Sequence, residues 1–329
     1  MATLGVDPLA ELATAMSMQA VAKMGWFNPQ DVTNLLWSIA KLGLNPGAEL
    51  VSAISRRSVE IAGDFRSQNV SSVMWSLATL GMEPGAELAT ALVRRAVSIT
   101  GDFIAQDLSS LMWALATLGM EPGAEMTTAM LTHAVAIAET FDSQAVANLM
   151  WALATLAIQP GAELMSAMSR QTLAIEGKVD SQHVSNMMWS LATLKLQPGA
   201  ELLSAMSRRA VMIADSFKSQ GVANLMWALA TLGLKPCTEL ALAMSRQAVV
   251  RSHDFNPQEV ANLLWALATL SMEPESELVK AMTGRAVAMA GLFNAQDVSN
   301  VMWALATLGM EPEVELATAM LRRGLEIER

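Results

Sequence analysis

Small amide and hydroxyl side chains recur beside regularly spaced tryptophans, and they are the residues best suited to binding chemistry. Three residues before each tryptophan stands an asparagine or a serine, and six residues before it stands a residue that varies. Amide side chains can satisfy the edge of a nucleotide base with two hydrogen bonds. A constant polar column beside a variable one therefore suits a modular reader of bases. The base-facing candidates are Asp31, Asn34, Asn69, Ser72, Asp107, Ser110, Asn148, His183, Asn186, Asn224, Glu259, Asn262, Asp297 and Asn300.

A structural explanation of the same columns stays open. Asparagine and the threonines that follow each tryptophan by four residues could tie the backbone of one repeat to the next. The variable column could simply lie exposed at the start of a helix, where Asp, Asn and Glu are favoured in any case. This explanation accounts well for the constant columns and poorly for His183 or Gly221.

Two further columns, 19 and 20 residues after each tryptophan, hold over half of the basic residues. The outer column includes Arg56 and Arg94 and lies on the same helical side as glutamates such as Glu49, so intrahelical ion pairs are expected. The inner column lies among apolar residues yet always holds a long hydrogen-bonding side chain. It could donate to free carbonyls at the C-terminus of the first helix, or it could contact phosphates. The phosphate candidates are Arg57, Arg95, Arg209, Arg285 and Arg323.

The elements that must position these side chains follow from a strict internal period. The tryptophans from Trp37 to Trp303 stand 38 residues apart each time, which defines eight repeats from about residue 27 to residue 329. Residues 1–26 match the second half of a repeat. Hairpins of this size cannot bury their apolar surface alone, so neighbours must stack. The period predicts one domain over residues 1–329, an all-α, right-handed α-solenoid superhelix of antiparallel helical hairpins.

Each repeat reads as two helices. The first is expected at roughly 29–42 in the first full repeat, with Gly43 in the left-handed conformation after its end. The second is expected to begin at the following proline, Pro46. At 100° per residue the first helix is apolar over a broad arc opposite the tryptophan, so we expect the indole to be buried as well. The exposed stripe would then hold the residues six and three before the tryptophan and one and four after it.

Composition limits the alternatives. Apolar residues make up 53% of the chain, but no uninterrupted apolar stretch is long enough to predict a transmembrane helix. The net charge of −10 is unfavourable for a nucleic-acid binder unless basic residues gather on one surface. The three histidines are isolated, the lone Cys237 has no nearby histidine, and no catalytic motif occurs. We expect no metal, no cofactor and no enzymatic activity.

The phrase "FNPQDVTNLLWSIAKLG" at residues 27–43, followed by a "PGAE" step, resembles the octotricopeptide repeat. That family of 38-residue helical hairpins is related to heptatricopeptide repeats and to the arrays attached to RAP domains. Where the family commonly has a tryptophan after its Glu, this chain has leucine, as in "PGAEL". The resemblance implies binding of organellar transcripts and a location in a chloroplast or mitochondrion, although the first residues do not read as a transit peptide.

Two functions therefore remain open. The first is a sequence-selective binder of single-stranded RNA that acts in organellar RNA stability, processing or translation and reads about one nucleotide per repeat. The second is an acidic scaffold that holds a protein or peptide in its concave groove. No membrane association is expected, and the terminal repeats could associate end to end with another copy.

Overall fold

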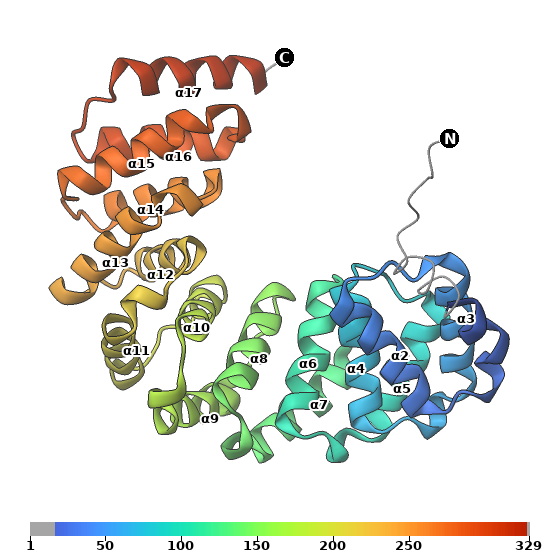
Figure 1. Ribbon diagram of the computed structural model, residues 1–329. Coiled ribbons are helices and arrows are strands. Elements are labelled where there is room, and N and C mark those ends of the chain that lie inside the picture. The colour runs from blue at the N-terminus through green and yellow to red at the C-terminus, as the bar shows by residue number, and fades with distance from the viewer. Residues whose placement is uncertain (1–16, 328–329) are drawn as a thin grey trace, which may run out of the picture. The chain divides into compact units, whose positions relative to one another are not determined.

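The computed structural model describes residues 17–327, and over this range the chain consists of helices joined by short turns (Figure 1). Each repeat forms two antiparallel α-helices, and a single turn of 3-10 helix joins each repeat to the next. The prediction of an α-solenoid of helical hairpins is confirmed. The first helices are α2 (Pro29–Leu42), α4 (Ser67–Thr79), α6 (Ala105–Thr117), α8 (Ser143–Thr155), α10 (Ser181–Thr193), α12 (Ser219–Thr231), α14 (Pro257–Thr269) and α16 (Ala295–Thr307).

The second helices complete the hairpins and are shifted by the same period. They begin one or two residues after the proline rather than at it, and from α3 to α15 one residue separates each from the next 3-10 turn. These helices are α3 (Gly47–Glu60), α5 (Ala86–Ser98), α7 (Ala124–Ala136), α9 (Gly161–Ala174), α11 (Ala200–Met212), α13 (Thr238–Val250), α15 (Ser276–Ala288) and α17 (Val314–Ile327). Of the leading half-repeat, residues 1–16 lie outside the described range, residues 17–23 are helical and Met24–Trp26 form a 3-10 turn.

Local sequence explains both ends of the first helices. The Asn28 side chain accepts hydrogen bonds from the backbone N–H groups of Gln30 and Asp31, and Pro29 occupies the first helical position. Gly43 ends the helix with φ 62°, in the left-handed region where glycine is favoured. Serines such as Ser67 and Ser181 are the first helical residues rather than the caps, because the cap lies one residue earlier. Asp180, for example, accepts from the His183 N–H.

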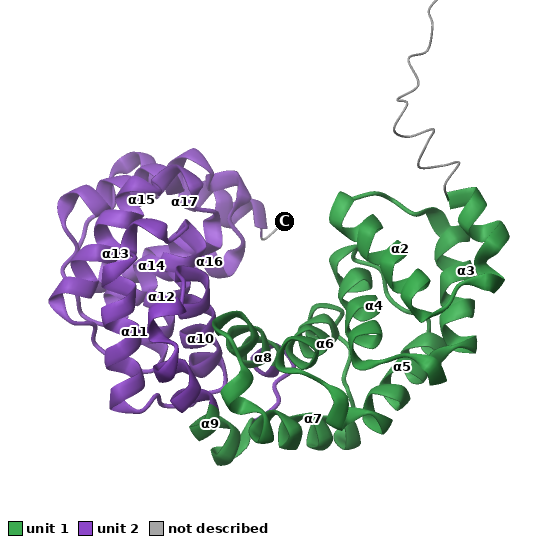
Figure 2. Ribbon diagram, turned by 60° about the horizontal axis from the view of Figure 1, so that its bottom comes forward, with its two compact units in different colours: residues 1–152, 160–167 green, residues 153–159, 168–329 purple. Residues whose placement is uncertain are grey.

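The chain divides into two compact units. Unit 1 comprises residues 1–152 and 160–167, and unit 2 comprises residues 153–159 and 168–329, so the division passes through α8 and α9. Within each unit the first helices contact one another far more extensively than the second helices do. The more closely spaced layer of a two-layer array lies on the inner side of its curve. In unit 1 the first helices α2, α4, α6 and α8 indeed lie inside α3, α5 and α7 (Figure 2).

The core of each hairpin is built from the residue ten before the tryptophan and from aliphatic residues of both helices. Phe65 and Phe217 are fully buried, and so are Leu50 and Ile54 of α3. Burial of a side chain of this size stabilises the fold by about 1.5–3 kcal/mol relative to leaving it exposed. In the described part of the chain, no helix combines the length and the apolar character needed to cross a membrane.

Candidate nucleic-acid interface

The first helices present one polar face to solvent in both units. It combines four columns: a glutamine seven before the tryptophan, the Asn or Ser three before it, the tryptophan itself, and the Thr or Lys four after it. At 100° per residue these positions fall within about 60° of one another, so they form a single ridge. The glutamines are all exposed. They are Gln30, Gln68, Gln106, Gln144, Gln182, Gln220, Gln258 and Gln296.

The expectation that the indoles are buried is wrong. Trp37 and Trp303 are 46% and 47% exposed, and the six tryptophans between them are partly exposed. The reason lies one residue later in the sequence, where small side chains such as Ser76 and Ala114 are fully buried between neighbouring first helices. These small residues bring neighbouring first helices too close together for an indole to fit between them. Each ring therefore lies on the solvent-facing side of its first helix.

Indoles of consecutive repeats lie near one another on this face. The ring centroids of Trp113 and Trp151 are 6.3 Å apart with 35° between the ring planes. At the other end of unit 1, the Lys41 Nζ lies 5.6 Å from the Trp37 ring and 5.1 Å from the Trp75 ring. Lys41 therefore lies near two indoles, at a position where the other repeats have threonine.

The column six before the tryptophan is buried in half of the repeats, at Asn69, Asp107, Ala145 and Asp297, and is exposed or partly exposed in the others. The Asn69 Nδ2 donates to Thr33 Oγ1 of the preceding first helix at 3.2 Å, and Ser67 Oγ donates to Asp107 Oδ2 at 3.0 Å. Asn69, Asp107 and Asp297 are 5–8% exposed. These three side chains are packed between helices, and Asp107 also lines a groove on this face. Contact of these residues with a ligand stays a prediction. Burial raises the pKa of both Asp107 and Asp297 above its ordinary value.

Packing also explains the other members of the variable column. A Cβ atom at Gly221 would lie 3.2 Å from Phe217 Cδ1 and 3.5 Å from Ser185 Oγ, so this position has little room for a side chain. Asp31 and Glu259 bind the backbone N–H of Asn28 and Asn256 in capping boxes. The His183 Nδ1 lies 3.2 Å from Asp180 Oδ1, at the start of α10.

The column three before the tryptophan is accessible, as predicted. Asn34 is exposed, and the Gln30 Nε2 donates to its Oδ1 at 2.8 Å, which joins two columns of the ridge. The remaining members are partly exposed: Ser72, Ser110, Asn148, Asn186, Asn224, Asn262 and Asn300. Their role in binding bases stays a prediction.

In unit 1 this face contains a groove. Its volume is about 670 Å³, and its lining includes Trp37, Lys41, Ser72, Trp75 and Ser110. The groove also reaches glutamines of three repeats, Gln68, Gln106 and Gln144. Reasoning from the sequence missed the glutamine and tryptophan columns. The available signal was the constant spacing: the glutamine stands four residues before the Asn or Ser and seven before the tryptophan, and the threonine stands four after the tryptophan. Residues three, four or seven apart lie on one side of a helix.

The inner basic column joins the second helix of a hairpin to the backbone just before its first helix. The Arg95 Nε donates to the Phe65 carbonyl at 2.7 Å, and the Gln247 Nε2 donates to the Phe217 carbonyl at 2.6 Å. The acceptor is a backbone carbonyl, but it precedes the first helix of the same repeat, whereas the expected acceptors were the carbonyls at the C-terminus of that helix. The same contact is made by Arg57, His133, Arg209, Arg285 and Arg323.

This contact places the guanidinium groups beside the N-termini of the first helices. The Nη1 atoms of Arg57 and Arg323 also pair with Glu60 and Glu326 at 3.0 Å and 3.4 Å. Their side chains keep 22% and 26% exposure, so part of each guanidinium still faces solvent. The prediction that the inner arginines contact phosphates stays untested.

Comparison with known protein families identifies the family of the chain. The family model for the RNA-editing substrate-binding complex 6 protein, RESC6, matches residues 10–199 and, a second time, residues 197–315. The two matches together cover most of the sequence. The chain belongs to the RESC6 family. No curated protein matches it.

Membership of the RESC6 family supports an RNA-associated role for the chain and agrees with its helical repeats. Two consecutive matches to one RESC6 model are expected of an array in which every repeat has the same pattern. The resemblance to the octotricopeptide repeat, and the chloroplast or mitochondrial location that it implies, stay predictions.

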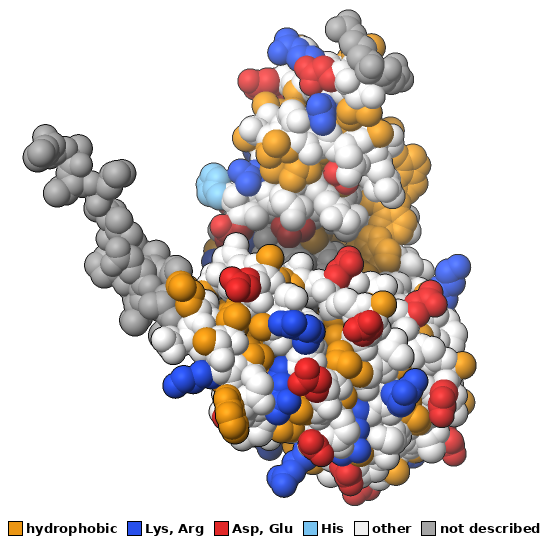
Figure 3. Space-filling view, turned by 90° about the vertical axis from the view of Figure 1, so that its right-hand side faces the viewer, with side chains coloured by type: hydrophobic (Ala, Val, Ile, Leu, Met, Phe, Trp, Pro, Cys, Tyr) orange, Lys and Arg blue, Asp and Glu red, His pale blue; other side chains and the backbone are white. Residues whose placement is uncertain are grey.

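The outer face of this RESC6-family chain differs from the ridge. Arg208 pairs with Glu176 of the preceding repeat at 3.2 Å rather than with a glutamate of its own helix, contrary to the expectation of intrahelical pairs. On the face of the molecule in Figure 3, basic and acidic side chains are interspersed and do not gather into one basic patch. Charge on that face therefore offers no continuous path for a phosphate backbone.

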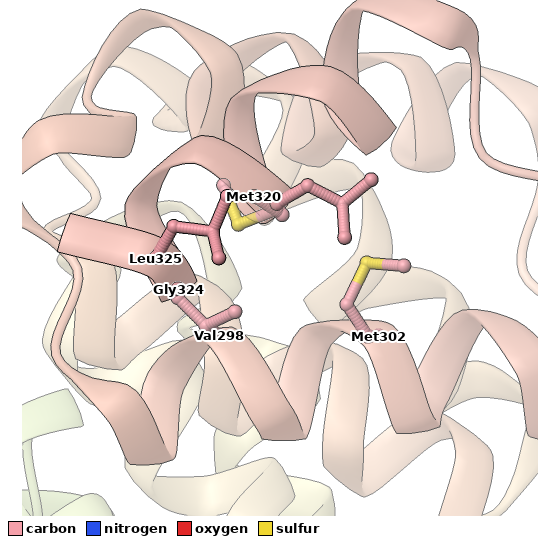
Figure 4. A pocket seen from close by; sticks show the side chains of 6 residues that line it. Val298, Met302, Met320, Gly324 and Leu325 are labelled. Carbon is pink, nitrogen blue, oxygen red and sulfur yellow. The ribbon is translucent and has the colours of Figure 1, made fainter. Parts of the chain in front are cut away.

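The last hairpin carries an apolar pocket of about 230 Å³ between α16 and α17 (Figure 4). Val298, Met302 and Met320 line it, together with Leu321 and Leu325, which are 67% and 63% exposed. One repeat earlier, the residues that correspond to Val298 and Met302 are Val260 and Leu264, and both are fully buried. End-to-end association through this surface stays a prediction.

Proposed function

We propose that the chain binds single-stranded RNA along the ridge of its first helices, the surface defined by the Gln, Asn or Ser, Trp and Thr columns. The observation that carries this proposal is that the tryptophans are partly exposed within one row of amide and hydroxyl groups. Membership of the RESC6 family, named for an RNA-editing complex, supports an RNA-associated role.

The chemistry of the ridge fits unpaired bases. An indole offers a flat apolar surface on which a base can stack, and such stacking contributes about 1–3 kcal/mol per base. The amide groups beside the indole offer donors and acceptors to the edge of the same base. A duplex hides these edges and base faces, so single strands should bind and duplexes should not.

Electrostatic attraction must come from the border of the ridge, because the ridge itself is almost uncharged. The N-termini of the first helices carry partial positive charge, and the guanidinium groups of Arg95 and Arg285 lie beside them. Phosphates following this border would be contacted by few cations. Affinity should therefore fall with salt, but with a shallow slope.

A role in binding rather than catalysis fits this arrangement. In the described residues, no three His, Cys, Asp or Glu side chains gather in a way that would hold a metal ion. We propose that the chain is not itself an enzyme and that it holds transcripts for stabilisation, processing or translation in an organelle. Selection among RNA sequences is part of this proposal.

The test is binding of a 20-nucleotide random RNA by fluorescence anisotropy, with the same sequence as a duplex for comparison. The triple variant Trp75→Ala, Trp113→Ala and Trp151→Ala should weaken binding by roughly 1–3 kcal/mol for each base that loses its stacking partner. Val250→Ala on the exposed surface of α13 is the control and should bind as the unaltered protein does. Circular dichroism checks that each variant remains helical. Equal binding by the triple variant would refute the proposed surface.

A second candidate, a protein-binding scaffold, is favoured by a groove between α11 and α13 in unit 2. It has a volume of about 670 Å³ and is lined by Leu203, Met212, Lys235 and Cys237. Met212, the last residue of α11, is 74% exposed. The equivalent last residues of α3 and α5 are polar, Glu60 and Ser98. If RNA does not bind at physiological salt, this groove is the surface to test for a protein ligand.

A further inference from the structure

We infer that the RNA recognised by the ridge is a tract in which one base repeats at successive positions. This inference rests on the proposed function and narrows its substrate class. It follows from comparing the repeats with one another, because every repeat presents the same four columns to the same side.

The exposed columns barely vary. The glutamine column is identical in all eight repeats, and the threonine column differs only at Lys41. The column three before the tryptophan is asparagine except at Ser72 and Ser110. In unit 2 the four first helices α10, α12, α14 and α16 therefore present identical residues at every position of the ridge.

The column that does vary supplies no continuous code, because Asn69, Asp107, Ala145 and Asp297 are buried and only the remaining members are exposed or partly exposed. Asn69, Asp107 and Asp297 are buried between first helices, and the backbone at Gly221 lies close to Phe217 and Ser185. Side chains packed in this way vary with the local fit of two helices. The variation that made this column attractive as a base reader is accounted for by packing and by capping of the first turn.

A modular array reads a mixed sequence only if the residues that contact the bases differ from repeat to repeat. Specificity is a difference in affinity between ligands, and identical groups in an identical setting give the same difference at each position. Each repeat of unit 2 should therefore prefer the same base. The affinity of the unit is greatest when that base occurs at every step.

The two serines define where the preference should be weaker. Serine is shorter than asparagine and cannot form the paired hydrogen bonds that an amide forms with a base edge. Ser72 and Ser110 lie in neighbouring helices α4 and α6 of unit 1, so that unit should be the less selective one. Asparagine fits the same position in the other repeats, which makes substitution there conservative.

The experiment compares four 12-nucleotide homopolymers with an RNA of the same length and mixed sequence, each measured by anisotropy at fixed salt. One homopolymer should bind about tenfold or more tightly than the mixed RNA, because each good amide–base pair discriminates by an amount of that order. The double variant Ser72→Asn and Ser110→Asn should bind the same homopolymer severalfold more tightly and leave the order of the others unchanged.

The converse variant carries Asn186→Ser, Asn224→Ser and Asn262→Ser. It should lose the preference between homopolymers and keep the weaker binding common to all of them, because the indoles are untouched. Tighter binding of the mixed RNA than of every homopolymer, or a change of preferred base in the Ser→Asn variant, would overturn the inference. Absence of binding to any of the five RNAs would instead reject the proposed function.

Discussion

The two helical layers of each unit have the same period but differ in what they hold constant. First helices are closely spaced and repeat their exposed residues almost without change. Second helices are farther apart and, apart from a constant exposed glutamate in the first turn such as Glu49 and Glu87, they vary at exposed positions. The outermost position of the last turn, for example, holds Glu60, Ser98, Met212 and Val250 in different repeats. Packing cannot explain constancy at an exposed position such as the glutamine column.

The constant glutamate of the second helices is accounted for by the partial positive charge at a helix N-terminus. The constant residues of the ridge extend along the whole first helix, which favours a requirement on the ridge beyond helix formation. A requirement for solubility would be met by any polar residue, as it is on the second helices. A requirement for a ligand with the same spacing as the repeats would keep glutamine, asparagine and tryptophan in place. The predictions below concern the contacts that hold the two layers together and shape the ridge.

The largest effect is expected where the layers are joined. Arg95→Ala removes the hydrogen bond from the Arg95 Nε to the Phe65 carbonyl and leaves that carbonyl without its donor. The cost should be about 1.5–3 kcal/mol, as for hydrogen bonds made by charged groups. The shift in the urea midpoint measures it. Arg95→Gln should retain part of the stability, because Gln247 makes the same contact in its own repeat.

The adjacent residue provides the control for this contact. Arg94 precedes Arg95, is exposed and belongs to the outer column. Arg94→Ala removes the same charge from the same turn of α5 and should change stability by less than about 0.5 kcal/mol. Equal effects of the two substitutions would show that stability depends on the charge of this turn and not on the hydrogen bond from Arg95 to the Phe65 carbonyl.

A smaller effect is expected at the C-terminal ends of the first helices. Ala157 has φ 54°, in the left-handed region that Gly119 occupies with φ 64° in another repeat. That conformation costs an L-residue about 1–2 kcal/mol, so Ala157→Gly should stabilise the protein by roughly 0.5–1 kcal/mol after the greater flexibility of unfolded glycine is included.

Gly119→Ala is the matched reverse substitution. A Cβ atom at Gly119 has no atom within 4 Å, so the substitution tests the backbone conformation without a steric clash. It should lower the urea midpoint by an amount similar to the gain at Ala157. If both substitutions destabilise the protein, the two turns do not share one conformational preference.

Much of this architecture could be predicted because the information is local. The 38-residue period, the proline and the glycine after the first helix were enough to place α2 within Pro29–Leu42 and Gly43 in its left-handed conformation. Short-range signals suffice in an array whose repeats contact only their neighbours. The prediction of a single domain is not tested by the division into two compact units.

The accessible face could not be predicted in the same way, because it depends on the distance between helices. A helical wheel places Trp75 and Ser76 at known angles but does not say how close the neighbouring helix lies. The small residues after each tryptophan set that distance, bury the variable column and expose the indole. The positions of Gln68, Ser72 and Thr79 lie within about 60° of Trp75 on a helical wheel, but the wheel does not show whether the indole beside them is covered by a neighbouring helix.

A pH-dependent effect is expected between first helices. The pKa of Asp107 is raised by burial, so the folded protein binds a proton at this carboxyl more tightly than the unfolded chain does. The contribution of Asp107 to stability is therefore most favourable at a pH below the unfolded value and is lost as the pH rises through the raised folded value.

Asp107→Asn isolates this contribution and copies the residue found at Asn69. The stability of the variant relative to the unaltered protein should increase from acidic to neutral pH, and urea unfolding at several pH values measures it. NMR titration of the carboxyl gives the pKa directly. A carboxyl that titrates below its ordinary range would contradict the burial of this column.

The smallest effect is expected at Lys41, the one cation of the ridge whose ammonium group lies near two indole rings. Exposed cation–π contacts contribute about 0.5–1 kcal/mol, so Lys41→Thr should destabilise unit 1 only slightly. Removal of a positive charge normally weakens RNA binding. Here the space between Trp37 and Trp75 becomes free for a base, so affinity should instead rise by less than about tenfold.

The salt dependence separates the two roles of Lys41. If the ammonium group occupies a stacking position and contacts no phosphate, the slope of log affinity against log salt stays the same in Lys41→Thr. If it contacts a phosphate, the slope decreases by about one and binding weakens. Thr79→Lys places the same cation one repeat further along and should lower affinity, because it fills a position that a base would otherwise occupy. Weaker binding of Lys41→Thr with a decreased slope would assign Lys41 to the phosphate backbone and leave the stacking role to the other indoles.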